Sequence, residues 1–183
     1  MRTWCPTVVL LMFLSPALAQ TAGDRFTHIA SFALGSTTFQ KISQSLGPVQ
    51  VVRTGDAGES LASMCYSIPG GYVTFLAGEL DGPEHYLGGV HVSRRASRGP
   101  CAKWERGPAI SFLRIGGLNV GMSRSQFQSE VRAPLSRKGS TVEASFEGKR
   151  KINDIDFDVV ITVTANVRAG RVSEIEVWKT ETN

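Results

Sequence analysis

The sequence predicts an α+β fold made of two similar units, each a short helical segment packed on an antiparallel β-sheet. One capped, amphipathic segment of helical length occurs in each half of the chain. Each segment is followed by runs in which apolar and polar residues alternate, a pattern typical of half-buried strands. A single α+β domain with two unrelated helical segments is the alternative architecture.

The first helical segment lies within residues 34–48. Ser36 or Thr37 is the expected cap, and Phe39, Ile42 and Leu46 recur on one face at helical spacing. A Gly-Pro pair at 47–48 ends the segment, because glycine adopts left-handed conformations and proline cannot continue a helix.

The second helical segment lies within residues 120–131. Ser123 is the expected cap, and Phe127 and Val131 are four residues apart on one face.

Strands are expected after each helix, separated by turns rich in Gly, Asp and Pro. In the first half they are residues 49–52, 61–68, 72–77 and 89–93; in the second half, 141–146, 157–167 and 172–179. Ala169 and Gly170 are expected to join the last two as a hairpin. The units therefore span residues 20–107, including a basic connector, and 108–183.

Residues 1–19 have the features of a secretory signal peptide. A weakly positive start precedes an apolar run at 8–14, and small residues at 17 and 19 suit a signal peptidase. The run is too short for a membrane span, and no later stretch is long enough. A periplasmic or secreted bacterial location after cleavage near Ala19 is expected; a retained membrane anchor is the alternative.

Cleavage would remove Cys5 and leave Cys65 and Cys101. Two cysteines in an exported chain predict one disulfide, and closing this loop stabilises a fold by up to about 4 kcal/mol in the chain-entropy model. Two buried free thiols are the alternative.

Residues 34–48 and 120–127 resemble a unit in which a Gly-x-Thr/Ser turn leads into a helix and then strands. Small bacterial outer-membrane-assembly lipoproteins share this unit, and the secreted β-lactamase inhibitory proteins carry it as a tandem repeat. The resemblance implies an exported helix-on-sheet protein that binds another protein without catalysis. No lipobox cysteine is present, the cysteine spacing does not repeat, and the two helices differ by one residue in apolar register.

Charge gathers in the connector between the two predicted units. The formal net charge of +4 is too small for a dedicated nucleic-acid binder, so no nucleic-acid partner is expected. The candidate binding residues are Arg94, Arg95, Arg98, Lys103, Trp104 and Arg106. A basic loop carrying a tryptophan suits an acidic protein or an anionic envelope component. A solvated connector with Trp104 packed on the core is the alternative.

Catalytic and metal-binding patterns are sparse, and neither a catalytic residue nor a metal or other cofactor is predicted. His85 and His91 flank a turn beside Glu84, without a third spaced ligand. Asp154, Asp156 and Asp158 alternate along a predicted strand and could hold calcium, but the calcium-loop pattern is absent. Cross-strand pairing with residues 149–151 explains these carboxylates more simply.

The sequence therefore predicts an exported, non-catalytic protein that binds a macromolecular partner through its sheet and its basic connector. Two other readings stay open: an envelope hydrolase that uses a carboxylate and a histidine, and a structural envelope-maintenance protein. The sequence does not specify the partner or the oligomeric state.

Overall fold

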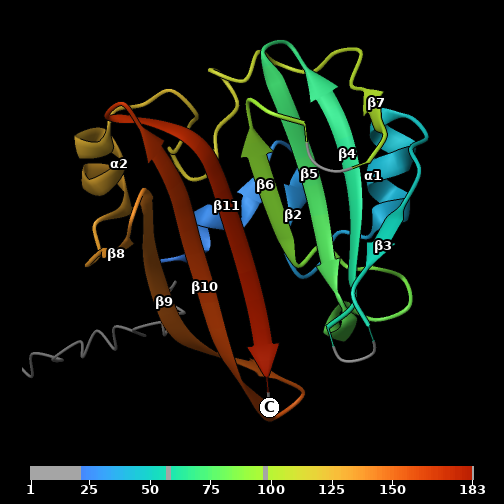
Figure 1. Ribbon diagram of the computed structural model, residues 1–183. Helices are drawn as coiled ribbons and strands as arrows, with labels where there is room; N and C mark the ends of the chain where they lie inside the picture. The colour runs from blue at the N-terminus through green and yellow to red at the C-terminus, as the bar shows by residue number, and fades with distance from the viewer. Residues whose placement is uncertain (1–21, 57–58, 97–98, 183) are drawn as a thin grey trace, which may run out of the picture.

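The computed structural model describes residues 22–56, 59–96 and 99–182 (Figure 1). The predicted signal peptide and Arg98 lie outside the described residues. In chain order the elements are η1 (Asp24–Phe26), β1 (His28–Ile29), β2 (Phe32–Ala33), α1 (Phe39–Leu46), β3 (Val52–Thr54), β4 (Leu61–Ile68), β5 (Gly71–Gly78), η2 (Glu79–Asp81), β6 (Gly89–Ser93), β7 (Cys101–Lys103), α2 (Arg124–Val131), β8 (Ser136–Lys138), β9 (Thr141–Ile152), β10 (Ile155–Arg168) and β11 (Arg171–Thr182).

One nine-stranded sheet dominates the part of the chain that the structure describes. Its strand order is β3-β4-β5-β6-β11-β10-β9-β8, antiparallel throughout, and β7 pairs in parallel with β4. The two halves of the chain meet where β6 pairs with β11, in the register Val90↔Val177 and Val92↔Ile175. These four side chains are buried, so the pairing carries one apolar face across the junction.

The expected architecture of two helix-on-sheet units is wrong. Strands of both halves form one continuous sheet, and the fold is dominated by this sheet, with two α-helices of eight residues each in the described part. The physical reason is that unpaired strand edges bind one another: joining β6 to β11 satisfies the backbone groups of both edges and merges their apolar faces.

The core lies on one face of the sheet. This face of the sheet is covered by the two helices and by two largely irregular segments, residues 22–38 and 108–122. The buried side chains of these segments include Phe26, Phe32, Ile115 and Leu118. The first segment crosses behind the sheet (Figure 1). Its Phe32 meets Phe75 of β5 at 5.6 Å between ring centroids, and its Phe26 meets Phe146 of β9 at 5.4 Å. Residue 26 therefore packs on a strand more than a hundred residues away.

The helices form where the apolar spacing predicted them. In α2, the Ser123 hydroxyl accepts from the Gln126 N–H and the Gln126 side chain accepts from the Ser123 N–H, which confirms the expected cap. In α1 the cap is Thr38, one or two residues later than expected. The Thr37 hydroxyl instead accepts from the Ala33 N–H, which closes the preceding turn.

The C-terminal end of α2 is tied to the start of the described chain. The Arg25 guanidinium donates to the carbonyls of Glu130 and Val131, and it lies 4.5 Å from the ring centroid of Phe26. A cation at this position satisfies carbonyls that have no partner within the helix and opposes the helix dipole.

The strands confirm most of the expected alternation. β4 and β6 have the expected bounds, whereas β5, β9, β10 and β11 extend beyond them. The turn at Ala169 and Gly170 has positive φ at both residues, as a type I′ hairpin requires. The prediction of a strand at residues 49–52 is wrong. β3 starts at Val52, because Val52 is the first residue of this segment to pair with β4, where its partner is Ser63.

Cys65 and Cys101 form the predicted disulfide. The two residues face each other across the pairing of β4 with β7, so the bond joins neighbouring strands. Among the described residues, we find no helix with the length and hydrophobicity needed to cross a membrane.

Candidate binding face

The second face of the sheet carries mostly polar side chains. We call this the open face; on β6, β9, β10 and β11 it includes the outward residues His91, Glu143, Ser145, Glu147, Val160, Thr162, Thr164, Asn166, Glu174, Glu176 and Trp178. All of these side chains are partly or fully exposed. In the described part of the chain, no element lies across β9, β10 and β11 on this side (Figure 1). The arrangement provides a broad, strand-built surface.

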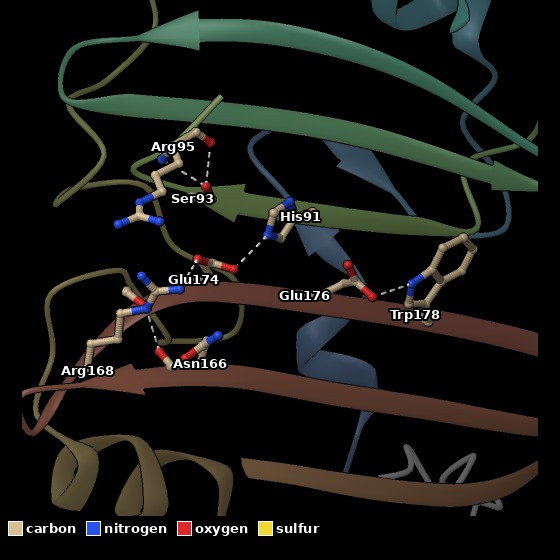
Figure 2. A network of polar contacts seen from close by, with 9 residues as sticks. His91, Ser93, Arg95, Asn166, Arg168, Glu174, Glu176 and Trp178 are labelled. Atoms are coloured by element: carbon tan, nitrogen blue, oxygen red, sulfur yellow. Dashed lines mark hydrogen bonds and ion pairs between the residues drawn. The ribbon is translucent and has the colours of Figure 1, made fainter. Parts of the chain in front are cut away.

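A polar network crosses the open face (Figure 2). The Glu174 carboxylate lies between the His91 imidazole and the Arg168 guanidinium. One carboxylate oxygen is 3.8 Å from His91 Nε2 and the other is 3.8 Å from Arg168 Nη2. Asn166 pairs with Glu174 and Val167 with Val172, so Ser173 is an extra residue in β11. Its hydroxyl donates to the Asn166 carbonyl at 3.0 Å, which closes this bulge.

Trp178 lies on β11 and belongs to the open face, opposite Gly89, the first residue of β6. Its indole Nε1 donates to Glu176 Oε1 at 2.9 Å (Figure 2). The indole lies across the backbone of Gly89 on β6, where a Cβ atom would come within 2.6, 2.8 and 2.9 Å of three ring atoms. Glycine at 89 and the carboxylate at 176 together hold the ring in one orientation while leaving it partly exposed.

Beyond Trp178 the sheet splits. β6 begins opposite Trp178, whereas β11 continues to Thr182 paired only with β10 among the described strands. The split leaves a groove of about 740 Å³ between β11 and the end of β5, lined in part by Leu61, Tyr86 and Trp178.

Two carboxylates that line this groove, those of Asp81 and Glu181, have shifted pKa values. Burial raises the pKa of Asp81, whose carboxylate accepts from the Gly78 N–H. For Glu181, burial acts in the opposite sense to the ion pairs with Lys179, at 2.5 Å, and Arg150, at 3.2 Å. These cations prevail and lower the pKa of Glu181.

The binding residues predicted from the sequence do not form one cluster. Arg94 and Arg95 follow β6 at the end of the open face and are exposed. Lys103 ends β7 at the outer edge of β4, where its ammonium pairs with Glu105 at 2.8 Å. Trp104 is partly buried and packs against the core, close to the backbone at 107.

Arg106, the remaining predicted residue within the described ranges, is exposed and follows Trp104. Strands β4 and β5 separate Lys103, Trp104 and Arg106 from the pair at 94–95. The set as a binding site stays a prediction.

The histidines and carboxylates singled out from the sequence have other partners. His85 Nε2 accepts from the Arg53 guanidinium at 2.7 Å, and His91 faces Glu174. Within the described ranges no group of three or more His, Cys, Asp or Glu side chains is placed to hold a metal ion.

The three aspartates lie at the β9–β10 hairpin. Asp154 is in the turn, with φ +64°, so the expectation that it shares a strand face with the other two is wrong. Asp158 pairs with Lys149 across the two strands at 3.8 Å, which confirms the cross-strand interpretation for this residue. Asp154, in the turn, pairs with Lys151 at 3.3 Å, three residues away in sequence, so its ion pair is local and not cross-strand.

None of Trp178, Gly89 and Glu174 was assigned to a binding site from the sequence. The available signal was the spacing of Glu174, Glu176 and Trp178, because residues two apart on a strand share a face. No local signal places Gly89 beneath an indole that lies 89 residues later in the chain.

No family model matches the chain, and no curated protein matches it. Among solved structures, the chain is similar to a Streptococcus mutans protein described as a "putative beta-lactamase inhibitor protein". The match has 13% identity, covers 80% of this chain and 83% of that one, and has a TM-score of 0.28. This TM-score is too low to establish a shared fold, and the tandem repeat is not confirmed.

Proposed function

We propose that this chain is an exported, non-catalytic protein that binds another protein through the open face. The observation that carries the proposal is the placement of Trp178, which is oriented by Gly89 and Glu176 on a surface that the described chain leaves uncovered. Partly exposed tryptophans held in one orientation are frequent energetic centres of protein interfaces, because little conformational entropy is lost when they bind.

The charge around Trp178 defines the chemistry of the partner. Glu143 and Glu147 on β9 are exposed, and neither they nor Glu176 forms an ion pair within the described part of the chain. A complementary protein surface therefore presents an apolar contact for the indole, surrounded by Lys or Arg side chains.

The basic residues predicted from the sequence enter the proposal as its border. Arg94 and Arg95 follow β6, and Ser93 anchors Arg95 by accepting from its N–H at 3.0 Å and donating to its carbonyl at 2.6 Å. Arg95 lies at the end of the open face (Figure 2), where it contacts acidic residues of the same partner.

Site-specific photo-crosslinking in the native host tests the proposal. A photoreactive residue is placed at Thr162, which pairs with Trp178, and at Gln128, an exposed position on α2. We expect one protein species, identified by mass spectrometry, to be crosslinked from 162 but not from 128. Purified β-lactamase is one probe to include, because of the resemblance at the helix starts.

Substitutions then locate the contact. Trp178→Ala should weaken binding of that species at least about tenfold, as expected for the loss of an interface anchor. Thr54→Ala, at an exposed position on β3, is the matched control and should change nothing. Equal crosslinking from both positions, or full binding by Trp178→Ala, would refute the open face as the interface. Loss of binding on Arg95→Glu together with full binding by Trp178→Ala would move the site to the basic residues.

A further inference from the structure

Three arginines from distant parts of the chain lie near Gly121: Arg94 and Arg171 contact this glycine, and Arg114 lines the same hollow as Arg94. Arg94 follows β6, Arg114 belongs to the irregular segment 108–122, and Arg171 begins β11. The end of β6, the start of β11 and the start of α2 lie at the same end of the molecule (Figure 1). We call these three residues the arginine cluster.

Backbone contacts hold the cluster together. Arg171 Nη1 donates to the Gly121 carbonyl at 2.9 Å, and the Gly121 N–H donates to the Val172 carbonyl at 2.8 Å. Arg94 Nη2 lies against the same glycine, 3.4 Å from the position that a Cβ atom would take. Gly121 thus stands between two guanidinium groups, at φ +99°, a conformation that glycine adopts readily.

Arg94 and Arg114 line one hollow of about 580 Å³ beside this glycine. Arg114 is oriented inside it, because its Nη1 donates to Asn119 Oδ1, while the Asn119 amide donates to the carbonyls of Ser111 at 3.3 Å and Val120 at 3.1 Å. The hollow is the size of a small-molecule site. The Arg114 side chain within it is held in place by hydrogen bonds that exist without a ligand.

The cluster carries unneutralised positive charge. No carboxylate within the described ranges forms an ion pair with Arg94, Arg114 or Arg171. One acidic side chain, Glu130 of α2, lines the hollow and lies close to Gly117 on its wall. Two arginines and one carboxylate line the hollow, and Arg171 bonds the carbonyl of the adjoining Gly121, which leaves a local excess of positive charge.

We propose that the arginine cluster binds a phosphoryl group of an anionic ligand. Guanidinium groups donate in pairs and match the several oxygens of a tetrahedral phosphate, whereas a single carboxylate offers two oxygens to one guanidinium. Glu130 opposes the charge of the ligand and moderates its affinity. The phosphoryl group comes either from a soluble phosphate ester or from a phospholipid headgroup.

Titration of the isotope-labelled protein with inorganic pyrophosphate tests the site directly. We expect saturable shifts of the backbone amide signals of Gly117 and Gly121 in NMR spectra, and none at Gly148 on β9. The variant Arg94→Gln with Arg171→Gln should bind at least about tenfold more weakly, because it loses two charged donors. Arg53→Gln with Arg137→Gln makes the same charge change at exposed positions elsewhere and should bind like the unmodified protein.

Glu130→Gln should raise the affinity for pyrophosphate about two- to fivefold, because it removes a negative charge that repels the ligand. A variant that failed to fold would bind more weakly, so unfolding cannot produce this result. Vesicles of phosphatidylcholine, with and without an equal amount of phosphatidylglycerol, distinguish the two sources. Binding to the anionic vesicles that pyrophosphate displaces indicates a lipid headgroup; binding of pyrophosphate alone indicates a soluble ester. No saturable shift at Gly121, vesicle binding that pyrophosphate does not displace, or equal affinity of the two double variants would overturn the site.

Discussion

Gly89→Ala is expected to destabilise the protein through Trp178. Gly89 lies in β6 with ordinary extended geometry, so alanine fits the backbone and on its own would stabilise by about 0.5 kcal/mol through the unfolded state. The new methyl group would, however, stand 2.6–2.9 Å from three atoms of the indole. Carbon atoms pack at about 3.5–4.0 Å, so the ring must leave its position.

The cost follows from what the indole loses when it moves. Its hydrogen bond to Glu176 is worth about 1 kcal/mol, and the apolar contact of one ring face is worth on the order of another 1–2 kcal/mol. After subtracting the backbone gain, Gly89→Ala should lower the free energy of unfolding by about 1.5–2.5 kcal/mol, in the range seen for overpacked sites.

Urea unfolding of four proteins measures this effect: the unmodified chain, Gly89→Ala, Trp178→Ala and the double variant. With Trp178 replaced, the methyl group meets no ring, so Gly89→Ala should be neutral or stabilising in that background. The expected coupling free energy between the two positions is about 2–3 kcal/mol. If Gly89→Ala costs the same in both backgrounds, the indole does not lie over Gly89 and the proposed anchor of the open face fails.

Three further predictions concern the stability of the fold. Burial raises the pKa of Tyr66 to about 12, above its unfolded value of 10.0, so stability should be fully present below pH 10 and fall as the pH rises toward 12. Tyr66→Phe, which also loses the bond to the Gly47 carbonyl, should remove that decline in alkaline denaturation curves. Cys65→Ser with Cys101→Ser should lower the free energy of unfolding in urea by about 2–4 kcal/mol, with no further effect of reductant. Arg25→Met, which leaves two carbonyls at the end of α2 without their donor, should cost about 1–2 kcal/mol and speed amide hydrogen exchange in α2 more than in β10.

Several features of this protein are local, and the sequence alone determined them. The extents of β4 and β6, the hairpin at Ala169–Gly170 and the Ser123 cap depend on alternation, turn conformation or a hydroxyl three residues from its amide partner. The pairing of Cys65 with Cys101 also followed from the sequence, because only these two cysteines remain once the predicted signal peptide is removed.

The candidate sites depend on pairing between distant segments. Alternation places Glu174, Glu176 and Trp178 on one face of β11, but it does not say that β6 is the neighbour or that Gly89 lies under the ring. The neighbours of the basic residues could not be predicted from the sequence either. Arg94 lies near Arg114 and Arg171, and not near Lys103 and Trp104.

The sequence therefore determined most of the strands, the Ser123 cap and the disulfide, which depend on nearby residues or on elimination. Only the tertiary structure decided that the two halves share one sheet, which face is open, and which arginines meet. The physical reason is that a strand's hydrogen bonds and one of its faces are satisfied by whichever edge pairs with it. That choice minimises the exposed edges and apolar surface of the whole chain, and no short window of sequence contains it.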